Sequence, residues 1–162
     1  MGLLFGGCSS LQQLDLSSFN TSNVTEMARM FAGCSALTSL DLSSFNTSNV
    51  KYMGGMFENC SALTSINLSN FNTEKVTDMR TMFGGCSGLT TLHLTNFNTS
   101  NVKYMSEMFK NCANLSTVVC ANAWSAPHSE QMFYGCVKLL GKAAFDANKT
   151  SVEMANPNSG YF

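Results

Sequence analysis

The sequence contains 162 residues, carries a formal net charge of −1, and has only 12% charged residues. A chain with this charge balance lacks the basic footprint that binding to nucleic acid or to an anionic membrane surface requires. No apolar run approaches the roughly 20 residues that cross a bilayer as a helix, and the length suffices for one domain with a hydrophobic core.

An internal repeat organises the sequence, and cysteines mark its period. They are Cys8, Cys34, Cys60, Cys86 and Cys112, each numbered 26 higher than the one before. Columns of Leu, Phe and Val keep the same step, as Phe45, Phe71 and Phe97 illustrate. A fixed period between roughly 20 and 50 residues is typical of solenoids, in which successive units stack to bury a shared core.

The chain begins within a unit. Residues 4–8 are similar to residues 30–34 and 82–86, which close later units. Cys8 is therefore interpreted as a repeat cysteine rather than as a lipoprotein cleavage site, and we expect further repeats or a cap upstream in a longer protein.

The first half of each unit has the pattern of a short, half-buried strand. Apolar residues alternate with polar ones, as Leu40 and Leu42 alternate with Asp41. The polar residues at the position of Asp41 in successive units are Asp15, Asp41, Asn67 and His93. Because like strands of stacked units pair in parallel, these side chains are predicted to form a row.

The second half of each unit has apolar residues at steps of three and four, as at Met27, Met30 and Phe31. This spacing is typical of one face of a helix. Helices are predicted near residues 22–32, 48–58, 74–84 and 100–110. The residues predicted as their N-caps are Thr21, Thr47, Thr73 and Thr99. The residue before each repeat cysteine is always Gly or Asn, which suits the left-handed residue that ends a helix.

These elements predict an α/β fold, a single-domain leucine-rich-repeat-like solenoid. Neighbouring parallel strands lie about 4.8 Å apart, whereas a helix is about 10 Å wide. The stack should therefore bend, with the parallel strands on the concave face and the short helices on the convex face.

The repeat becomes irregular towards the C-terminus. Residues 1–112 are interpreted as tandem strand–helix repeats, and residues 113–162 as a degenerate repeat and C-terminal cap of the same domain. The motif that ends at Cys136 follows Cys112 two positions too early for a full period, and Trp124 interrupts the strand pattern. A terminal unit of a solenoid must cover the apolar edge of the stack.

The repeat resembles that of a known family. Residues 37–63, LTSLDLSSFNTSNVKYMGGMFENCSAL, resemble the 26-residue unit of the BspA-like leucine-rich-repeat surface proteins, and residues 155–162 are similar to the closing motif of that domain. The resemblance implies an extracellular protein of the bacterial cell surface that adheres to host extracellular-matrix proteins or to other cells. It implies no catalytic residues and no cofactor.

The row of polar residues on the concave face is the candidate binding site. Its residues are Asp15, Asp41, Asn67, His93, Ser39, Ser65 and Thr91. Solenoids use such extended surfaces to bind partners. The alternative interpretation is that these are short polar residues on the solvated face of a sheet. Two stacked Asp residues are too few for a calcium site.

The cysteines are interpreted as reduced, buried thiols. They lack the closely spaced pairs of metal sites, and a free Cys packs as a small hydrophobe. Stacking would nevertheless make cysteines of adjacent units neighbours, so the sequence distance alone does not exclude disulfides.

The predicted function is a non-enzymatic module for protein–protein interaction or adhesion. One alternative is a structural spacer that displays other domains and binds nothing itself. Another is a hydrolase in the cap around residues 124–136, with Cys136, His128 and Asp146 as its catalytic residues; nothing in their spacing supports it.

Overall fold

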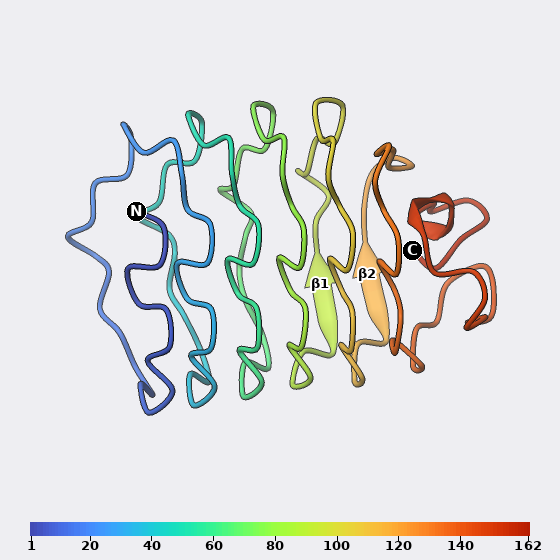
Figure 1. The fold of residues 1–162 in the computed structure, drawn as a ribbon, viewed down its shortest axis with the longest axis horizontal. Coiled ribbons are helices and arrows are strands. Elements are labelled where there is room, and N and C mark those ends of the chain that lie inside the picture. The colour runs from blue at the N-terminus through green and yellow to red at the C-terminus, as the bar shows by residue number, and fades with distance from the viewer.

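The computed structural model describes all 162 residues, and they form an elongated stack of coils (Figure 1). Strands β1 (Thr91–His93) and β2 (Thr117–Val119) pair in parallel, with Leu92 opposite Val118. The 3₁₀ helix η1 (Val152–Met154) lies near the C-terminus. The remaining chain consists of turns and extended segments that recur from coil to coil, and no helix is long or apolar enough to span a membrane.

The stack follows the 26-residue period. We number the coils 1 (9–34), 2 (35–60), 3 (61–86), 4 (87–112) and 5 (113–136). Parallel bridges join Glu26 to Tyr52, Tyr52 to Asp78, and Asp78 to Tyr104, each one repeat apart. The next bridge joins Tyr104 to His128, which lies two positions short of a full repeat. The predicted register is thus confirmed for coils 1–4, and coil 5 is shorter.

The predicted helices at 22–32, 48–58, 74–84 and 100–110 are absent. In their place each coil has a zigzag of tight turns, which we call the turn segment (26–34 in coil 1 and its counterparts in later coils). Alternate amides bond to the next coil, as Met27 N does to Tyr52 O at 2.9 Å and Phe31 N to Met56 O at 2.9 Å. The amides between them close turns within the coil, as Met30 N does to Met27 O at 3.2 Å. The turn segments therefore join the coils edge to edge.

Left-handed residues explain why these segments are not helical. Arg29 and Gly33 have φ angles of 55° and 75°, and the counterparts of both in later coils are also left-handed. An α-helix of L-residues does not accommodate such a residue every fourth position. The Gly or Asn before each cysteine is left-handed as predicted, but it belongs to a repeating zigzag instead of a helix end. A four-residue zigzag reproduces the apolar spacing of a helix.

The threonines predicted as N-caps join adjacent coils. The Thr21 hydroxyl accepts the amide N–H of Asn46 at 2.8 Å and donates to the carbonyl of the same residue at 3.0 Å. The same pair of hydrogen bonds joins Thr47 to Asn72 and Thr73 to Asn98. The N-cap interpretation is wrong because no helix follows these residues and the hydroxyl faces the neighbouring backbone.

The core consists of continuous columns of identical side chains. The rings of the central Phe column stack with centroids 5.5–5.8 Å apart. Its members are Phe5, Phe31, Phe57, Phe83, Phe109 and Phe133. Met, Leu and Cys columns lie beside it and are buried. Burying one such large side chain contributes about 1.5–3 kcal/mol, so stacking supplies the burial that an isolated coil lacks.

The cysteine column is unbridged. Six of the seven free thiols are buried, and Cys8 is exposed. The Cys60 thiol donates to the carbonyl of Phe31 at 3.2 Å, and the Cys86 thiol donates to that of Phe57 at 2.9 Å. Each buried thiol of the column thus bonds to the backbone of the preceding coil.

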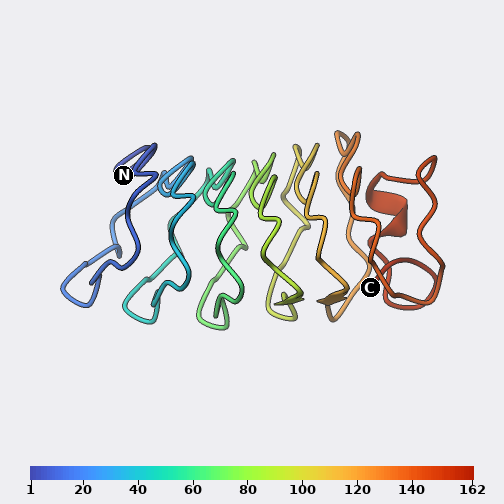
Figure 2. The same ribbon diagram turned by 90° about the horizontal axis from the view of Figure 1, so that it is seen from below.

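The two sides of the stack are held differently. The extended segments 13–17, 39–43 and 65–69 make no backbone–backbone hydrogen bond to a neighbouring coil, and strand pairing occurs only between β1 and β2. Without helices, the reason for the predicted curvature disappears. Figure 2 shows the coils lying closer together along the turn segments than along the extended segments. The extended segments therefore do not line a concave face.

The C-terminal residues close the last coil. The rings of Tyr161 and Phe162 pack edge-on against Phe133, with centroids 5.4 and 5.7 Å away. The Tyr161 hydroxyl accepts the N–H of Asp146 at 2.8 Å and shares its one hydrogen between the carbonyls of Asp146 and Lys149, at 3.1 and 2.9 Å. These contacts cover the end of the aromatic column.

Candidate functional site

The predicted binding residues share one face of the stack, which we call the strand face. It comprises Asp15, Asp41, Asn67, His93, Ser39, Ser65 and Thr91. Thr91 is half-buried and the other six are exposed. Alternation works as predicted, because Leu40 and Leu42 are buried on either side of the exposed Asp41. The stacking places Asp41 and its counterparts in one row, although only His93 of that row lies in a regular strand.

The first three members of the row share one local hydrogen bond. Oδ1 of Asp41 accepts the backbone N–H of Ser43 at 2.9 Å, and Asp15 does the same with Ser17 at 2.9 Å. The hydroxyl and the N–H of Ser17 lower the pKa of the Asp15 carboxyl group, and the N–H and the hydroxyl of Ser43 lower the pKa of Asp41, so both groups are ionised at neutral pH. In the next coil, Oδ1 of Asn67 accepts the backbone N–H of Ser69 at 3.0 Å. The bond fixes each side chain while its second polar atom stays available to a partner.

A shallow hollow interrupts the strand face between coils 2 and 3. Its volume is about 320 Å³. Its lining residues are Ser39, Leu40, Asp41, Ser65, Ile66 and Asn67. The two extended segments that line it are not hydrogen-bonded to each other. Polar side chains therefore flank two apolar ones, an arrangement that can receive one side chain of a partner.

The opposite side, which we call the turn face, carries exposed aromatic and charged residues. Tyr52 and Tyr104 are 47% and 40% exposed. The Arg80 guanidinium lies 5.0 Å from the centre of the Tyr104 ring and 2.6 Å from a carboxylate oxygen of Asp78. The Tyr104 ring also stacks on His128 at 5.1 Å. In the sequence, the signal for this surface is a set of exposed positions at which the residue type differs from one repeat to the next.

The residues of the hydrolase alternative have separate contacts. Cys136 is buried, and its thiol donates to the carbonyl of Phe109 at 2.9 Å. His128 stacks on Tyr104 at the turn face, and the Asp146 carboxylate accepts the N–H of Asn148 at 2.9 Å. No hydrogen bond joins the three residues to one another. The structure does not bring them together as a nucleophile, a base and an orienting group. No group of three or more His, Cys, Asp or Glu side chains is arranged to hold a metal ion.

The stack of coils with short parallel strands has a leucine-rich-repeat-like fold. It is similar to the crystal structure of the T. pallidum leucine rich repeat protein (TpLRR), with a TM-score of 0.56 and 22% sequence identity. The similarity covers 86% of this chain and 59% of the T. pallidum chain, so this chain spans less than two thirds of that chain.

The family of the chain follows from its sequence. Residues 1–85 and 61–156 match the family described as "Mycoplasma protein of unknown function, DUF285", and the chain belongs to this family. No curated protein matches the sequence. The chain is therefore a leucine-rich-repeat-like protein of a family without an established function.

Proposed function

We propose that this chain is a non-enzymatic interaction module that binds a partner protein through its strand face. Its repeat fold presents an extended lateral surface, which solenoids commonly use for binding. The resemblance of residues 37–63 to the BspA-like repeat supports a role in adhesion to host extracellular-matrix proteins or to other cells.

One observation carries this proposal: polar side chains in fixed positions flank a hollow with an apolar floor. Asp41 and Asn67 lie on two neighbouring coils, and each is held by a hydrogen bond to its own coil. Leu40 and Ile66 lie between the polar groups. A partner loses less conformational entropy when it meets groups that are already fixed. An apolar side chain that fills the hollow, next to a cationic or amide group, would match it.

The proposed location is the bacterial cell surface, outside the cell. Thiols are uncommon in extracellular proteins because they oxidise there. Oxidation proceeds through the thiolate, and burial raises the pKa of the Cys60 thiol to about 12. A buried column of protonated thiols is therefore compatible with an oxidising exterior.

The test is binding of the chain to immobilised host matrix proteins, measured by biolayer interferometry. Asp41→Asn keeps the acceptor for the Ser43 amide, as Asn67 shows, and removes only the charge. Combined with Asn67→Ala, it should weaken binding at least tenfold. The exposed Glu74→Gln is the matched control and should bind as the wild type does. Unchanged binding of the double variant would remove the strand face as the site.

Two further outcomes favour the alternatives. If the wild type binds no matrix protein and no cell surface, the proposal fails and a spacer role is favoured. If the chain hydrolyses substrates of a general esterase and peptidase panel and Cys136→Ala abolishes this activity, the hydrolase alternative replaces the proposal.

A further inference from the structure

Coil 5 is two residues shorter than the others, and the deficit falls in one connection. In coil 4 the connection from the strand side to the turn segment is residues 95–103. In coil 5 it is residues 121–127, because His93 pairs with Val119 before it, which puts Leu94 opposite Cys120, and Tyr104 pairs with His128 after it. The shorter connection cannot follow the edge of coil 4 along its whole length.

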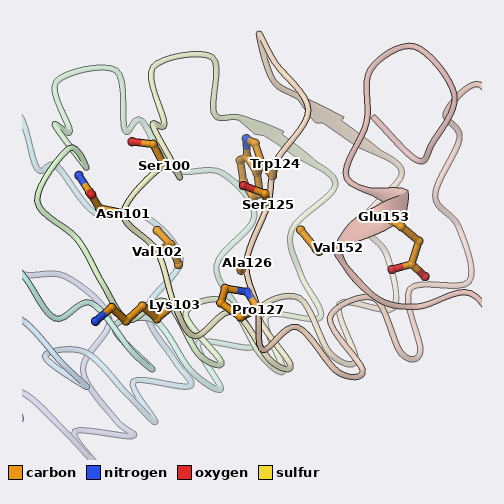
Figure 3. A pocket seen from close by; sticks show the side chains of 10 residues that line it. All are labelled: Ser100, Asn101, Val102, Lys103, Trp124, Ser125, Ala126, Pro127, Val152 and Glu153. Atoms are coloured by element: carbon orange, nitrogen blue, oxygen red, sulfur yellow. The ribbon is translucent and has the colours of Figure 1, made fainter.

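An open cleft lies along this edge of coil 4. One part, about 510 Å³ in volume, lies between residues 100–103 and residues 124–127, with Val152 and Glu153 at its far side (Figure 3). A second part of about 400 Å³ lies between residues 95–100 and residues 122–125. Both parts are lined by Ser100, Trp124 and Ser125, so they adjoin. We call the two parts together the Trp124 cleft.

The corresponding edge of coil 3 is fully paired. Asn98 bonds Thr73 twice, through its N–H to the hydroxyl at 2.8 Å and through its carbonyl at 2.9 Å. Two asparagine side chains complete the contact. Asn96 Nδ2 donates to the carbonyl of Phe71 at 2.6 Å, and Asn101 Nδ2 donates to the carbonyl of Glu74 at 2.7 Å.

In coil 4, the three groups that correspond to the Phe71 carbonyl, the Thr73 hydroxyl and the Glu74 carbonyl have no partner. The carbonyls of Phe97 and Ser100 and the hydroxyl of Thr99 make none of the hydrogen bonds that their counterparts make in coil 3. Thr99 is only 7% exposed and lines the cleft. The residue that would pair with it is Trp124, whose amide instead donates to the carbonyl of Ala155 at 2.9 Å. No buried side-chain nitrogen or oxygen lacks a hydrogen-bond partner, so the unpaired Thr99 hydroxyl opens onto the cleft, where a ligand can reach it.

We propose that the Trp124 cleft binds a short extended peptide with neutral amide side chains, which pairs with coil 4 as coil 4 pairs with coil 3. One residue of the peptide bonds the Thr99 hydroxyl through its backbone N–H and carbonyl. Two Asn side chains donate to the carbonyls of Phe97 and Ser100. The recognised pattern is Asn-x-Asn-x-x-Asn, the spacing of Asn96, Asn98 and Asn101.

Neighbouring side chains restrict the ligand further. The Trp124 ring stacks on Phe97 with centroids 6.3 Å apart. Because this ring already covers Phe97, the peptide residue between the first two Asn residues of the pattern must be small. Lys103 and Glu153 line the cleft with opposite charges, which favours a ligand without net charge. This site lies apart from the strand face and does not depend on the function proposed for that face.

The experiment uses the full chain and the acetylated, amidated hexapeptide Asn-Ala-Asn-Thr-Ser-Asn. Trp124 is the single tryptophan of the chain, so its fluorescence reports binding, and calorimetry measures the affinity. Binding should be saturable, and a control peptide with Ala in place of each Asn should bind at least tenfold more weakly. Absence of binding at millimolar peptide, or equal binding of both peptides, would overturn the proposal.

Two threonine variants test the contact itself. Thr99→Val removes the unpaired hydroxyl and should weaken peptide binding at least fivefold without lowering the melting temperature. Thr73→Val removes a hydroxyl that already pairs with Asn98, so it should lower the melting temperature and leave peptide binding unchanged. Unchanged binding to Thr99→Val, or a melting temperature lowered equally by both variants, would contradict the proposed role of Thr99.

Discussion

The buried thiol column should make the fold sensitive to alkaline pH. Burial raises the pKa of the Cys60 thiol from 9.0 to about 12 and also raises the pKa of Cys86. A hydrogen bond with the next thiol of the column, together with burial, raises the pKa of Cys112. A group whose pKa is raised by folding contributes its full stability below the unfolded pKa. That stability is lost as the pH rises from 9 towards the pKa of the folded state.

The size of the effect follows from linkage. At pH 10 a thiol with a pKa of 9.0 is about 90% ionised in the unfolded chain, and the folded state loses about 1.4 kcal/mol relative to pH 7 for each thiol that stays protonated. Cys60, Cys86 and Cys112 together account for roughly 4 kcal/mol by the same relation. The total stability of a domain is about 5–15 kcal/mol, so the loss is large enough to measure.

Urea unfolding at pH 7 and pH 10, followed by circular dichroism in the presence of reductant, measures this loss. Cys60→Ser keeps a donor for the Phe31 carbonyl but does not titrate in this range. The variant should lose about 1.4 kcal/mol less than the wild type between the two pH values. The exposed Cys8→Ser is the control and should lose as much as the wild type. Equal losses for wild type and Cys60→Ser would refute the assigned burial of this thiol.

Three other predictions test the packing. At pH 8, iodoacetamide should modify only Cys8 rapidly in the native chain and all seven cysteines in denaturant, because only Cys8 is exposed; mass spectrometry showing a second rapidly modified thiol would contradict this. Phe83→Asp should abolish folding, since an unpaired carboxylate would replace a ring with no exposed surface, whereas the exposed Thr90→Asp should not; a folded Phe83→Asp chain is the adverse result. Gly85→Ala should lower stability by about 1–2 kcal/mol, because Gly85 has a φ of 73° and a Cβ there would meet the Asn59 side chain; an unchanged melting temperature would argue against the left-handed turn.

Much of the core could be read from the sequence, because a repeat of identical residues leaves few alternatives for stacking. The constant step of the cysteines determined the register, and the columns of Leu40, Phe57 and Cys60 are buried as the periodicity requires. The exposure of Asp41 followed from alternation with its apolar neighbours.

The helices were predicted wrongly because two different backbones produce the same spacing. Apolar residues at Met27, Met30 and Phe31 suit a helix and also a zigzag with a four-residue period. The residues that decide between them are left-handed, but Arg29 and Thr81 are neither Gly nor Asn and gave no signal. Their strain, about 1 kcal/mol or more each, is offset by hydrogen bonds between coils that a single unit does not contain.

The threonines and the Trp124 cleft show two further limits of prediction from the sequence alone. A hydroxyl that accepts a backbone N–H suits an N-cap and a contact between coils equally well, so Thr47 could not be assigned from its own unit. The Trp124 cleft did have a sequence signal, namely the shortened step between Cys112 and Cys136. That step located the irregular coil but not the side on which it leaves the edge of coil 4 unpaired.

The most direct test of the stacked zigzag is a nuclear Overhauser spectrum of the isotope-labelled chain. The structure predicts contacts between residues about one repeat apart, such as the Met27 amide with the α-proton of Tyr52 and the Phe57 ring with the Phe83 ring. It also predicts that the segment 26–34 lacks the contacts between residues four apart that an α-helix gives. Helical contacts throughout that segment, with no cross-peak between Met27 and Tyr52, would contradict the account.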